Sequence, residues 1–165
     1  MVYKPAEDTY FLLDAVKDIE DNVLELGCGS CFVLSNIKAG FKVGCDLVKP
    51  YEIKNGIEFV LADCKNAPFR VNSFSYIIFN PPYLPSENII DIAVDGGKGG
   101  IEVPLNFLKT SLSLIKKNGK IYFIVSSLSD YKTVELFLEN MNLGYVKKEK
   151  KLFYEILYLY IVNFV

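Results

Sequence analysis

The segment FNPPY at positions 79–83 has the most specific chemistry in this sequence. Pro81 and Pro82 fix the backbone φ angle and remove two N–H donors, so carbonyl groups are left as hydrogen-bond acceptors. Asn80 adds a side-chain carbonyl. Two acceptors hold both hydrogens of a planar NH₂ group and leave its nitrogen facing a methyl donor, and Tyr83 can stack on a flat amide or base. The segment predicts methyl transfer to an amide or ring nitrogen, with a simple proline turn as the alternative.

An amide nitrogen is a poor nucleophile because its lone pair is delocalised. Acceptors on its hydrogens push electron density onto nitrogen, and alignment with a sulfonium methyl group lowers the entropic part of the barrier. The chain contains no histidine, which excludes Ser-His-Asp and Cys-His nucleophiles and histidine-bound metals. Methyl transfer to an amide needs no strong base, so the composition agrees with this chemistry.

A second motif, ELGCGSC at positions 25–31, is typical of a loop that binds a nucleotide-like cofactor. Gly27 and Gly29 allow a tight turn and a close approach to a ligand. A dinucleotide fingerprint would need a glycine where Phe32 stands. The methyltransferase pattern, acidic-x-G-x-G-x-G, has Glu25 in first place but finds Cys31 in place of its third glycine. The leading acid favours this second pattern over an ordinary strand-to-helix turn.

Two acids follow at the ends of expected strands. Asp46 stands 19 positions after Gly27, where an acid binds the ribose hydroxyls in nucleotide-binding sheets. Asp63 is placed to accept a hydrogen bond from an adenine amino group. The alternative for each is a solvated strand end.

The chain has four cysteines: Cys28, Cys31, Cys45 and Cys64. The first two form C-x-x-C, but a zinc ribbon expects a second such pair, and none is present. All four fall near the ends of the expected strands. We expect small packing residues around a cofactor crevice, with a metal or redox role as the alternative, and no bound metal.

Short apolar runs alternate with helical patterns along the chain. Strands are expected at 22–28, 41–47, 57–63, 74–79, 120–126, 145–152 and 155–163, and helices at 5–17, 32–39, 103–117 and 129–142. This alternation predicts an α/β fold with helices on both faces of a parallel sheet. The last two strands are joined too closely for a parallel crossover, so they are expected to be antiparallel. A mostly parallel, seven-stranded sheet with an antiparallel C-terminal hairpin is the Rossmann-like fold of S-adenosylmethionine-dependent methyltransferases. We expect one such domain over 1–165.

The connection at 48–55 is short for a parallel crossover and is expected to hold at most one helical turn. The third strand then becomes a thinly covered sheet edge, open to a partner.

The chain has 18 basic and 20 acidic residues, for a formal net charge of −2. Its net charge therefore gives no general electrostatic attraction to nucleic acid. Lys147, Lys148, Lys150 and Lys151 alternate with Glu149 on an expected strand. A solvated face is the first interpretation of this run, and a basic docking patch is the alternative.

Acids at Glu7, Asp8 and Asp14 argue against a signal peptide, and the longest apolar run, 156–165, is too short to span a bilayer. We expect a cytoplasmic protein with reduced thiols, or one of cytosol and nucleus in a eukaryote, and no membrane partner.

PAEDTYFLLDA (5–15), ELGCGSC, FNPPY and DGGKGGIE (95–102) occur in the order seen in HemK-type methyltransferases. The chain resembles their short archaeal and eukaryotic branch, which lacks the bacterial amino-terminal domain, and the resemblance runs from Tyr3 to about Phe164. NPPY is shared with DNA and RNA amino-methyltransferases, whereas PAEDT is specific to the branch.

The resemblance implies S-adenosylmethionine-dependent N5-methylation of the glutamine in the Gly-Gly-Gln motif of a class-1 translation release factor. It implies that Asn80, Pro81, Pro82 and Tyr83 hold the glutamine amide. Together with Cys28 and Gly29 of the glycine loop, the candidate cofactor contacts are Thr9, Glu25, Gly27, Cys28, Gly29, Asp46, Asp63, Cys64 and Asn80. The family also implies a small zinc-containing activator subunit, which would form a heterodimer by adding to the third strand around Ile57 to Ala62.

Two departures from the family pattern stand out: Cys31 replaces the third glycine, and the segment 88–94 lacks a tryptophan often seen there. The remaining alternatives are an adenine-N6 or cytosine-N4 methyltransferase of DNA or RNA, and an inactive scaffold with the same fold.

Overall fold

The structure is a computed structural model that describes residues 4–85 and 96–164. Tyr3, Asp95 and the segment 88–94, which are part of the family resemblance described above, lie outside the described residues.

A seven-stranded sheet has the order β3-β2-β1-β4-β5-β7-β6. Its strands are β1 Val23–Leu26, β2 Lys42–Asp46, β3 Ile57–Leu61, β4 Phe74–Phe79, β5 Ile115–Ser126, β6 Gly144–Lys151 and β7 Ile156–Asn163.

The sheet is parallel from β3 to β5 and antiparallel at its C-terminal end. β1 lies between β2 and β4, and β5 extends the parallel part beyond β4. β7 runs antiparallel to both β5 and β6. This confirms the predicted mixed sheet with a C-terminal hairpin.

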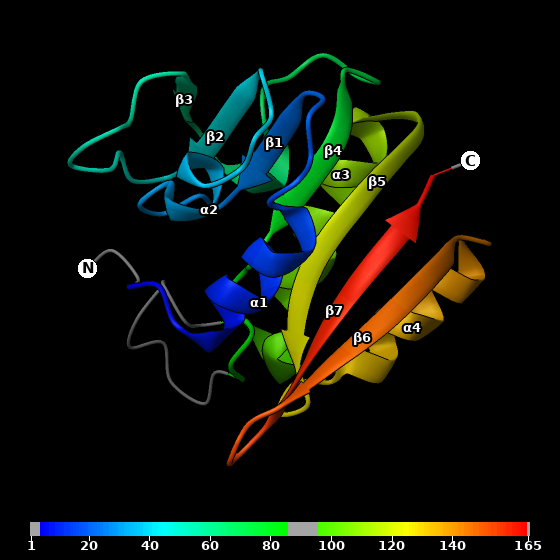
Figure 1. Ribbon diagram of the computed structural model, residues 1–165. Coiled ribbons are helices and arrows are strands. Elements are labelled where there is room, and N and C mark those ends of the chain that lie inside the picture. The colour runs from blue at the N-terminus through cyan, green and yellow to red at the C-terminus, as the bar shows by residue number, and fades with distance from the viewer. Residues whose placement is uncertain (1–3, 86–95, 165) are drawn as a thin grey trace.

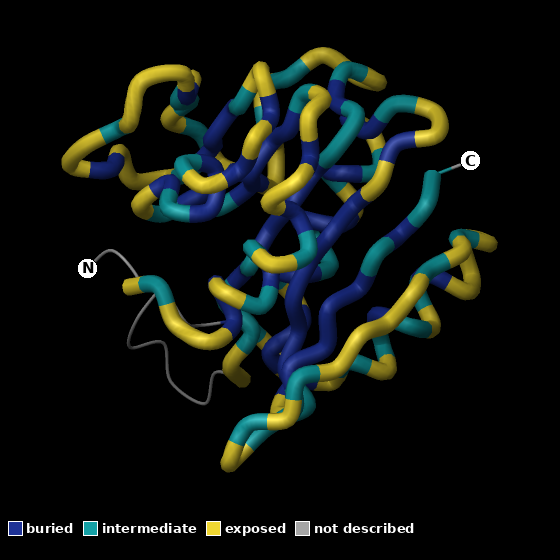
Figure 2. The backbone as a smooth tube through the Cα atoms, in the orientation of Figure 1, coloured by how far each residue is buried: buried dark blue, intermediate teal, exposed yellow. Residues whose placement is uncertain are grey.

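Helices cover both faces of the sheet, as Figure 1 shows. They are α1 Glu7–Val16, α2 Phe32–Ser35, α3 Glu102–Leu114 and α4 Tyr131–Asn140, with short 3₁₀ turns η1 Cys64–Asn66 and η2 Lys98–Gly100. One buried cluster packs α1 and α2 against the sheet through Leu12, Val16 and Leu34. The other packs α3 and α4 through Phe107, Leu108 and Leu138. Figure 2 shows β4, β5 and β7 as the buried centre and β6 as an exposed edge.

All four helices are shorter than predicted, and for two of them the structure shows why. The helix expected at 32–39 is the single turn α2, because the Asn36 side chain donates back to the carbonyl of Phe32 (2.7 Å) and Ile37 turns into the core. The helix expected at 103–117 ends at Leu114. Ile115 instead pairs with Phe74 of β4 and begins β5, whose register shifts by a bulge before Lys120.

β3 lies at one edge of the sheet and pairs with β2 alone among the described strands. The segment 47–56 that leads to it contains no helix. Large apolar side chains are exposed on β3 and on the segment that leads to it: Leu47, Val48, Tyr51 and Leu61. The predicted thinly covered edge is confirmed.

Among the described helices, none is both long enough and apolar enough to cross a membrane.

Candidate functional site

The loops that carry the candidate residues leave the carboxyl ends of neighbouring parallel strands. Gly27 to Gly29 follow β1, Asp46 ends β2, Asp63 and Cys64 follow β3, and Asn80 to Tyr83 follow β4. Because these strands are parallel, the loops meet at one edge of the sheet, which is where ligands bind in open α/β folds. The structure thus brings the two main motifs together.

The glycine loop is held in a left-handed conformation by the neighbouring strand. Gly27 and Gly29 have φ values of 68° and 52°. The Gly27 N–H donates to the carbonyl of Cys45 (2.8 Å), and the Gly29 N–H donates to Oδ2 of Asp46 (2.8 Å). Oδ1 of Asp46 accepts from the N–H of Val48 (3.1 Å). The acid expected at the ribose therefore also fixes the position of the glycine loop.

Cys31 occupies the place of the third motif glycine and adopts a glycine-like backbone. Its φ is 58° and its side chain is fully buried. Its Sγ lies 3.4 Å from Sγ of Cys28. Space for the two sulfurs comes from Gly44 on β2, where an added Cβ would lie 2.8 Å from Sγ of Cys28 and 3.3 Å from Sγ of Cys31. A glycine one strand away thus accommodates the departure from the motif.

The other two cysteines lie beneath the same loop. The thiol of Cys64 donates to the carbonyl of Cys45 (3.3 Å), and its sulfur accepts from the N–H of Gly27 (3.2 Å). All four cysteines are buried and none is in a disulfide. The contact with Cys31 and burial raise the pKa of the Cys28 thiol, while the same contact lowers the pKa of Cys31. In the part of the chain that the structure describes, no group of three or more Cys, Asp or Glu side chains is arranged to hold a metal ion.

Glu25 is a buried acid directly below the glycine loop. It is 4% exposed, and its Oε2 has no hydrogen-bond partner among the described residues. Burial, together with the charges of Cys31 and Asp46, raises the pKa of Glu25 well above its usual value. An unpaired buried oxygen is costly unless a ligand supplies a partner.

Asn80 has the second unpartnered oxygen of the site. Its Oδ1 is buried and makes no hydrogen bond to the described residues. Pro81 and Pro82 have no N–H to offer it. The side-chain carbonyl predicted as an acceptor is therefore present at the carboxyl edge of β4 with its hydrogen-bonding capacity unused.

Tyr83 is held in place by Asp8 of α1, a residue that was not among the predicted site residues. The Tyr83 hydroxyl donates to Oδ2 of Asp8 (2.9 Å), and Asp8 is only 4% exposed. Oδ1 of Asp8 accepts from the N–H of Thr9 (2.7 Å) and from its hydroxyl (3.3 Å). Thr9 also accepts from the N–H of Ala6 and so caps the start of α1. The sequence does carry a signal for Asp8, because it is an acid in the branch-specific PAEDT segment and directly precedes Thr9, a predicted cofactor contact.

The glycines at 96–100 hold the other side of the same loop. The N–H of Gly96 donates to the carbonyl of Leu84 (2.9 Å). An added Cβ would lie 2.7 Å from Cα of Tyr83 at Gly96, and would overlap the carbonyl oxygen of Tyr83 at Gly100. The Ser129 hydroxyl donates to that same oxygen. The glycine-rich motif, to which the sequence analysis gave no role, allows two backbone segments to touch and so positions the FNPPY loop.

Asp63 is the most loosely connected candidate. It is exposed, and its Oδ1 accepts from the N–H of Lys65 (2.9 Å), which caps η1. Its proposed contact with adenine stays a prediction.

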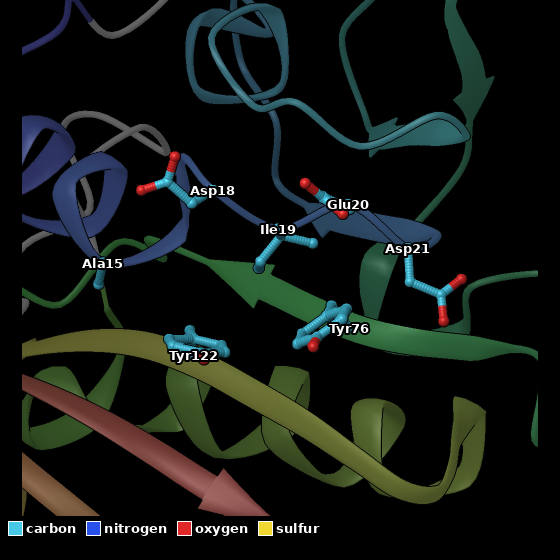
Figure 3. Close-up of a pocket in the computed structure, with 7 residues that line it drawn as sticks. All are labelled: Ala15, Asp18, Ile19, Glu20, Asp21, Tyr76 and Tyr122. Atoms are coloured by element: carbon cyan, nitrogen blue, oxygen red, sulfur yellow. The ribbon is translucent and has the colours of Figure 1, made fainter.

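A hollow of about 450 Å³ lies away from this edge, around the segment before β1 and the first half of β4 (Figure 3). Its lining consists of Ala15, Asp18, Ile19, Glu20, Asp21, Tyr76 and Tyr122. None of these is a candidate site residue, and Asp18 is already paired with Lys38 (2.6 Å).

No protein-family model matches the chain. A Methanocaldococcus jannaschii protein with the name "Putative protein N5-glutamine methyltransferase" is 34% identical over 149 aligned positions, covering 79% of this chain and 75% of that protein. The eRF1 methyltransferase catalytic subunit mtq2 of Schizosaccharomyces pombe is 28% identical, with 74% of this chain and 71% of that protein covered.

Among solved structures, the E. cuniculi Mtq2-Trm112 complex, described as responsible for methylation of the eRF1 translation termination factor, is similar with a TM-score of 0.82. The identity is 28%, and the match covers 99% of this chain and 98% of that chain. A Burkholderia thailandensis N1-methyltransferase with bound S-adenosylhomocysteine has a TM-score of 0.59 at 13% identity, covering 87% and 71% of the two chains, and shares the fold.

Proposed function

We propose a specific reaction for this chain, which belongs to the protein N5-glutamine methyltransferase family. In it, the methyl group of S-adenosylmethionine passes to the side-chain nitrogen of the glutamine in the Gly-Gly-Gln motif of a class-1 translation release factor. The observation that carries the proposal is the buried, unpartnered Oδ1 of Asn80 at the carboxyl edge of β4. Relatives named for eRF1 methylation support the choice of substrate, and this substrate would place the enzyme in the cytoplasm.

At the substrate amide, the chain supplies acceptors. Oδ1 of Asn80 would accept one hydrogen of the glutamine NH₂, and a carbonyl of the Asn80–Pro81–Pro82 segment would accept the other. Holding both hydrogens orients the nitrogen lone pair and increases its electron density, and the fixed geometry lowers the entropic part of the barrier. The proton leaves after transfer, so the absence of histidine is no obstacle.

The residues at the end of β1 fit S-adenosylmethionine. Oε2 of Glu25 is buried without a partner, and the left-handed Gly27 and Gly29 leave room for a ligand close to the backbone. Asp46 ends β2 beside this loop, and each of its carboxylate oxygens accepts from one backbone N–H. Each oxygen keeps a further lone pair, with which Asp46 would accept from the ribose hydroxyls. When bound, S-adenosylmethionine supplies an electrophilic methyl group on a sulfonium ion.

We also propose that a small zinc-containing activator subunit pairs with the edge of β3, around Ile57 to Ala62. Support comes from the unpaired side of β3, the exposed side chains of Leu47, Val48, Tyr51 and Leu61, and the Trm112 subunit named in the E. cuniculi complex. An added strand would satisfy the edge amides and cover those side chains. An obligate contact of this kind buries roughly 2,000 Å² or more.

The activator contact is tested by Leu61→Asp, with Leu136→Asp on α4 as the matched control, because both leucines are exposed. Leu61→Asp should abolish co-purification with the activator, whereas the control variant should co-purify normally. Normal co-purification of Leu61→Asp would contradict an interface at β3.

The substrate is tested with the chain co-expressed with its activator and labelled S-adenosylmethionine. Label should pass to purified release factor and disappear when the glutamine of its Gly-Gly-Gln motif is changed to arginine. Label on that variant would mean another target residue. Transfer to DNA or RNA oligonucleotides in place of release factor would establish the nucleic-acid alternative, and no binding of S-adenosylmethionine by the heterodimer would establish the scaffold alternative.

A further inference from the structure

Two large aromatic side chains project from the turn between β6 and β7. Phe153 is 88% exposed and Tyr154 is 85% exposed, and their rings pack edge to face with centroids 4.7 Å apart. The N–H of Leu152 donates to the carbonyl of Glu155 (2.8 Å) and closes the turn. Figure 1 shows this turn projecting past the end of β5, at the bottom of the view. Exposed aromatic side chains that come in pairs are typical of protein interfaces.

The aromatic tip is attached to the segment that holds the FNPPY loop. The carboxylate of Glu155 accepts from the hydroxyl of Ser126 at the end of β5. Ile156 and Ser127 exchange hydrogen bonds of 2.9 and 2.8 Å. Two residues further along, Ser129 donates to the carbonyl of Tyr83. One short segment therefore connects the tip to the loop that would hold the substrate amide.

A second connection runs through α1. Nζ of Lys150 on β6 lies 2.6 Å from Oε2 of Glu7, in the first turn of α1. The next residue, Asp8, accepts from the Tyr83 hydroxyl. The tip is thus fixed to the candidate active site from both sides, although β7 and β5 separate it from β4.

Charge distinguishes this edge from the rest of the molecule. Lys147, Lys148, Lys150 and Lys151 surround one acid, Glu149, in a chain whose formal net charge is −2. Lys147 pairs with Glu135 and Lys150 with Glu7. Lys148 and Lys151 are exposed and make no ion pair with the described residues. Two lysines without an acidic partner among the described residues, one on each face of the edge strand β6, stand beside the aromatic tip and complement an acidic surface that also offers apolar area.

We propose that Phe153, Tyr154, Lys148 and Lys151 form a docking surface for the methyl-accepting protein, and that they bind an acidic and apolar patch beside its glutamine loop. This inference rests on the proposed function. Neighbouring strands are about 4.8 Å apart, so β7 lies roughly 10 Å from β4. A standard protein interface covers about 800 Å² on each partner. A folded substrate whose glutamine reaches Asn80 therefore extends over the tip, whereas a short peptide does not.

The test compares two substrates, the intact release factor and a short peptide with its Gly-Gly-Gln sequence, on the heterodimer with its activator. Phe153→Ala combined with Tyr154→Ala should raise the KM for the intact protein about 10- to 30-fold and leave kcat unchanged. The KM for the peptide should change less than twofold. Phe41→Ala is the matched control, because Phe41 is an exposed aromatic that precedes β2, the strand next to the opposite edge of the sheet.

The charge component is tested by Lys148→Glu combined with Lys151→Glu. This variant should raise the KM for the intact protein, and the difference from wild type should shrink at high salt. Lys117→Glu combined with Lys120→Glu is the control, since it makes the same charge change at the amino end of β5. Circular dichroism and thermal melting confirm folding for each variant.

An unchanged KM for the intact protein in both variants would overturn the docking surface, as would an equal loss on protein and peptide. Loss of RNA binding with normal protein kinetics would assign the basic strand to nucleic acid and overturn it too. Failure of the wild-type heterodimer to methylate either substrate would instead contradict the proposed function, so the two failures are distinguishable.

Discussion

Tyr83→Phe removes a single hydroxyl from the candidate active site and keeps the aromatic ring. That hydroxyl donates to Oδ2 of Asp8 at 2.9 Å, and Asp8 is buried. A hydrogen bond to a charged group contributes about 1.5–3 kcal/mol. If this bond positions the FNPPY loop, much of that free energy is lost at the transition state. Each 1.4 kcal/mol corresponds to a tenfold change in rate, so kcat/KM should fall about 10- to 100-fold.

The assay is steady-state methylation of release factor by the heterodimer, with Tyr83→Phe, Asp8→Asn and the double variant. The two residues share this hydrogen bond, so the losses should be strongly non-additive, and the double variant should be little worse than the worse single variant. Binding of S-adenosylmethionine by Tyr83→Phe should stay within a few-fold of wild type. Normal turnover of Tyr83→Phe, or additive losses in the double variant, would refute a positioning role for this hydrogen bond.

Three further changes test other parts of the site. Asp46→Ala should weaken S-adenosylmethionine binding by about 1.5–3 kcal/mol in calorimetry, because it removes a charge-assisted bond and frees the Gly29 amide; unchanged affinity would leave Asp46 as a strand end only. Gly44→Ala should lower stability by about 1–3 kcal/mol in denaturant unfolding, since its Cβ would lie 2.8 Å from Sγ of Cys28, and adding Cys28→Ala should recover part of the loss; an unchanged midpoint for Gly44→Ala would contradict the packing described. Burial raises the pKa of Glu25 well above 4.5, so the folded protein retains a proton that the unfolded chain has lost, and stability falls as pH rises above that value. Glu25→Gln should therefore gain stability relative to wild type as the pH rises above 4.5 in thermal melts, and parallel profiles would contradict the raised pKa.

The strand pattern could be predicted because apolar runs in this chain end sharply. β4 matches its expected bounds, 74–79, since a nearly continuous apolar run is followed directly by Asn80 and two prolines. The edge position of β3 could be predicted because the connection at 48–55, between β2 and β3, is too short to hold a covering helix. The end of α3 could not be predicted, because Lys116 and Lys117 look like the last turn of a helix, and only the pairing of Ile115 with Phe74 of β4 shows that the helix has ended.

Within the site, residues at strand ends could be predicted from the sequence. Residues that matter through contacts with segments distant in the sequence could not. Asp8 looks like an ordinary acid in a first helical turn, and its contact with Tyr83 joins positions 75 residues apart. Gly44 and Gly100 matter because of side chains and carbonyls brought against them by other segments. Such roles depend on packing, which leaves no local pattern in the sequence.

The central claim is that the side-chain carbonyl of Asn80 holds the substrate amide for methyl transfer. The most direct test is kcat for methylation of release factor by the Asn80→Ala heterodimer at saturating substrate and S-adenosylmethionine, with folding checked by circular dichroism. Removing one pre-organised group of this kind typically costs about 10²–10³ in rate, so kcat should fall by that factor while binding of S-adenosylmethionine stays within tenfold. A kcat within tenfold of wild type would contradict the account.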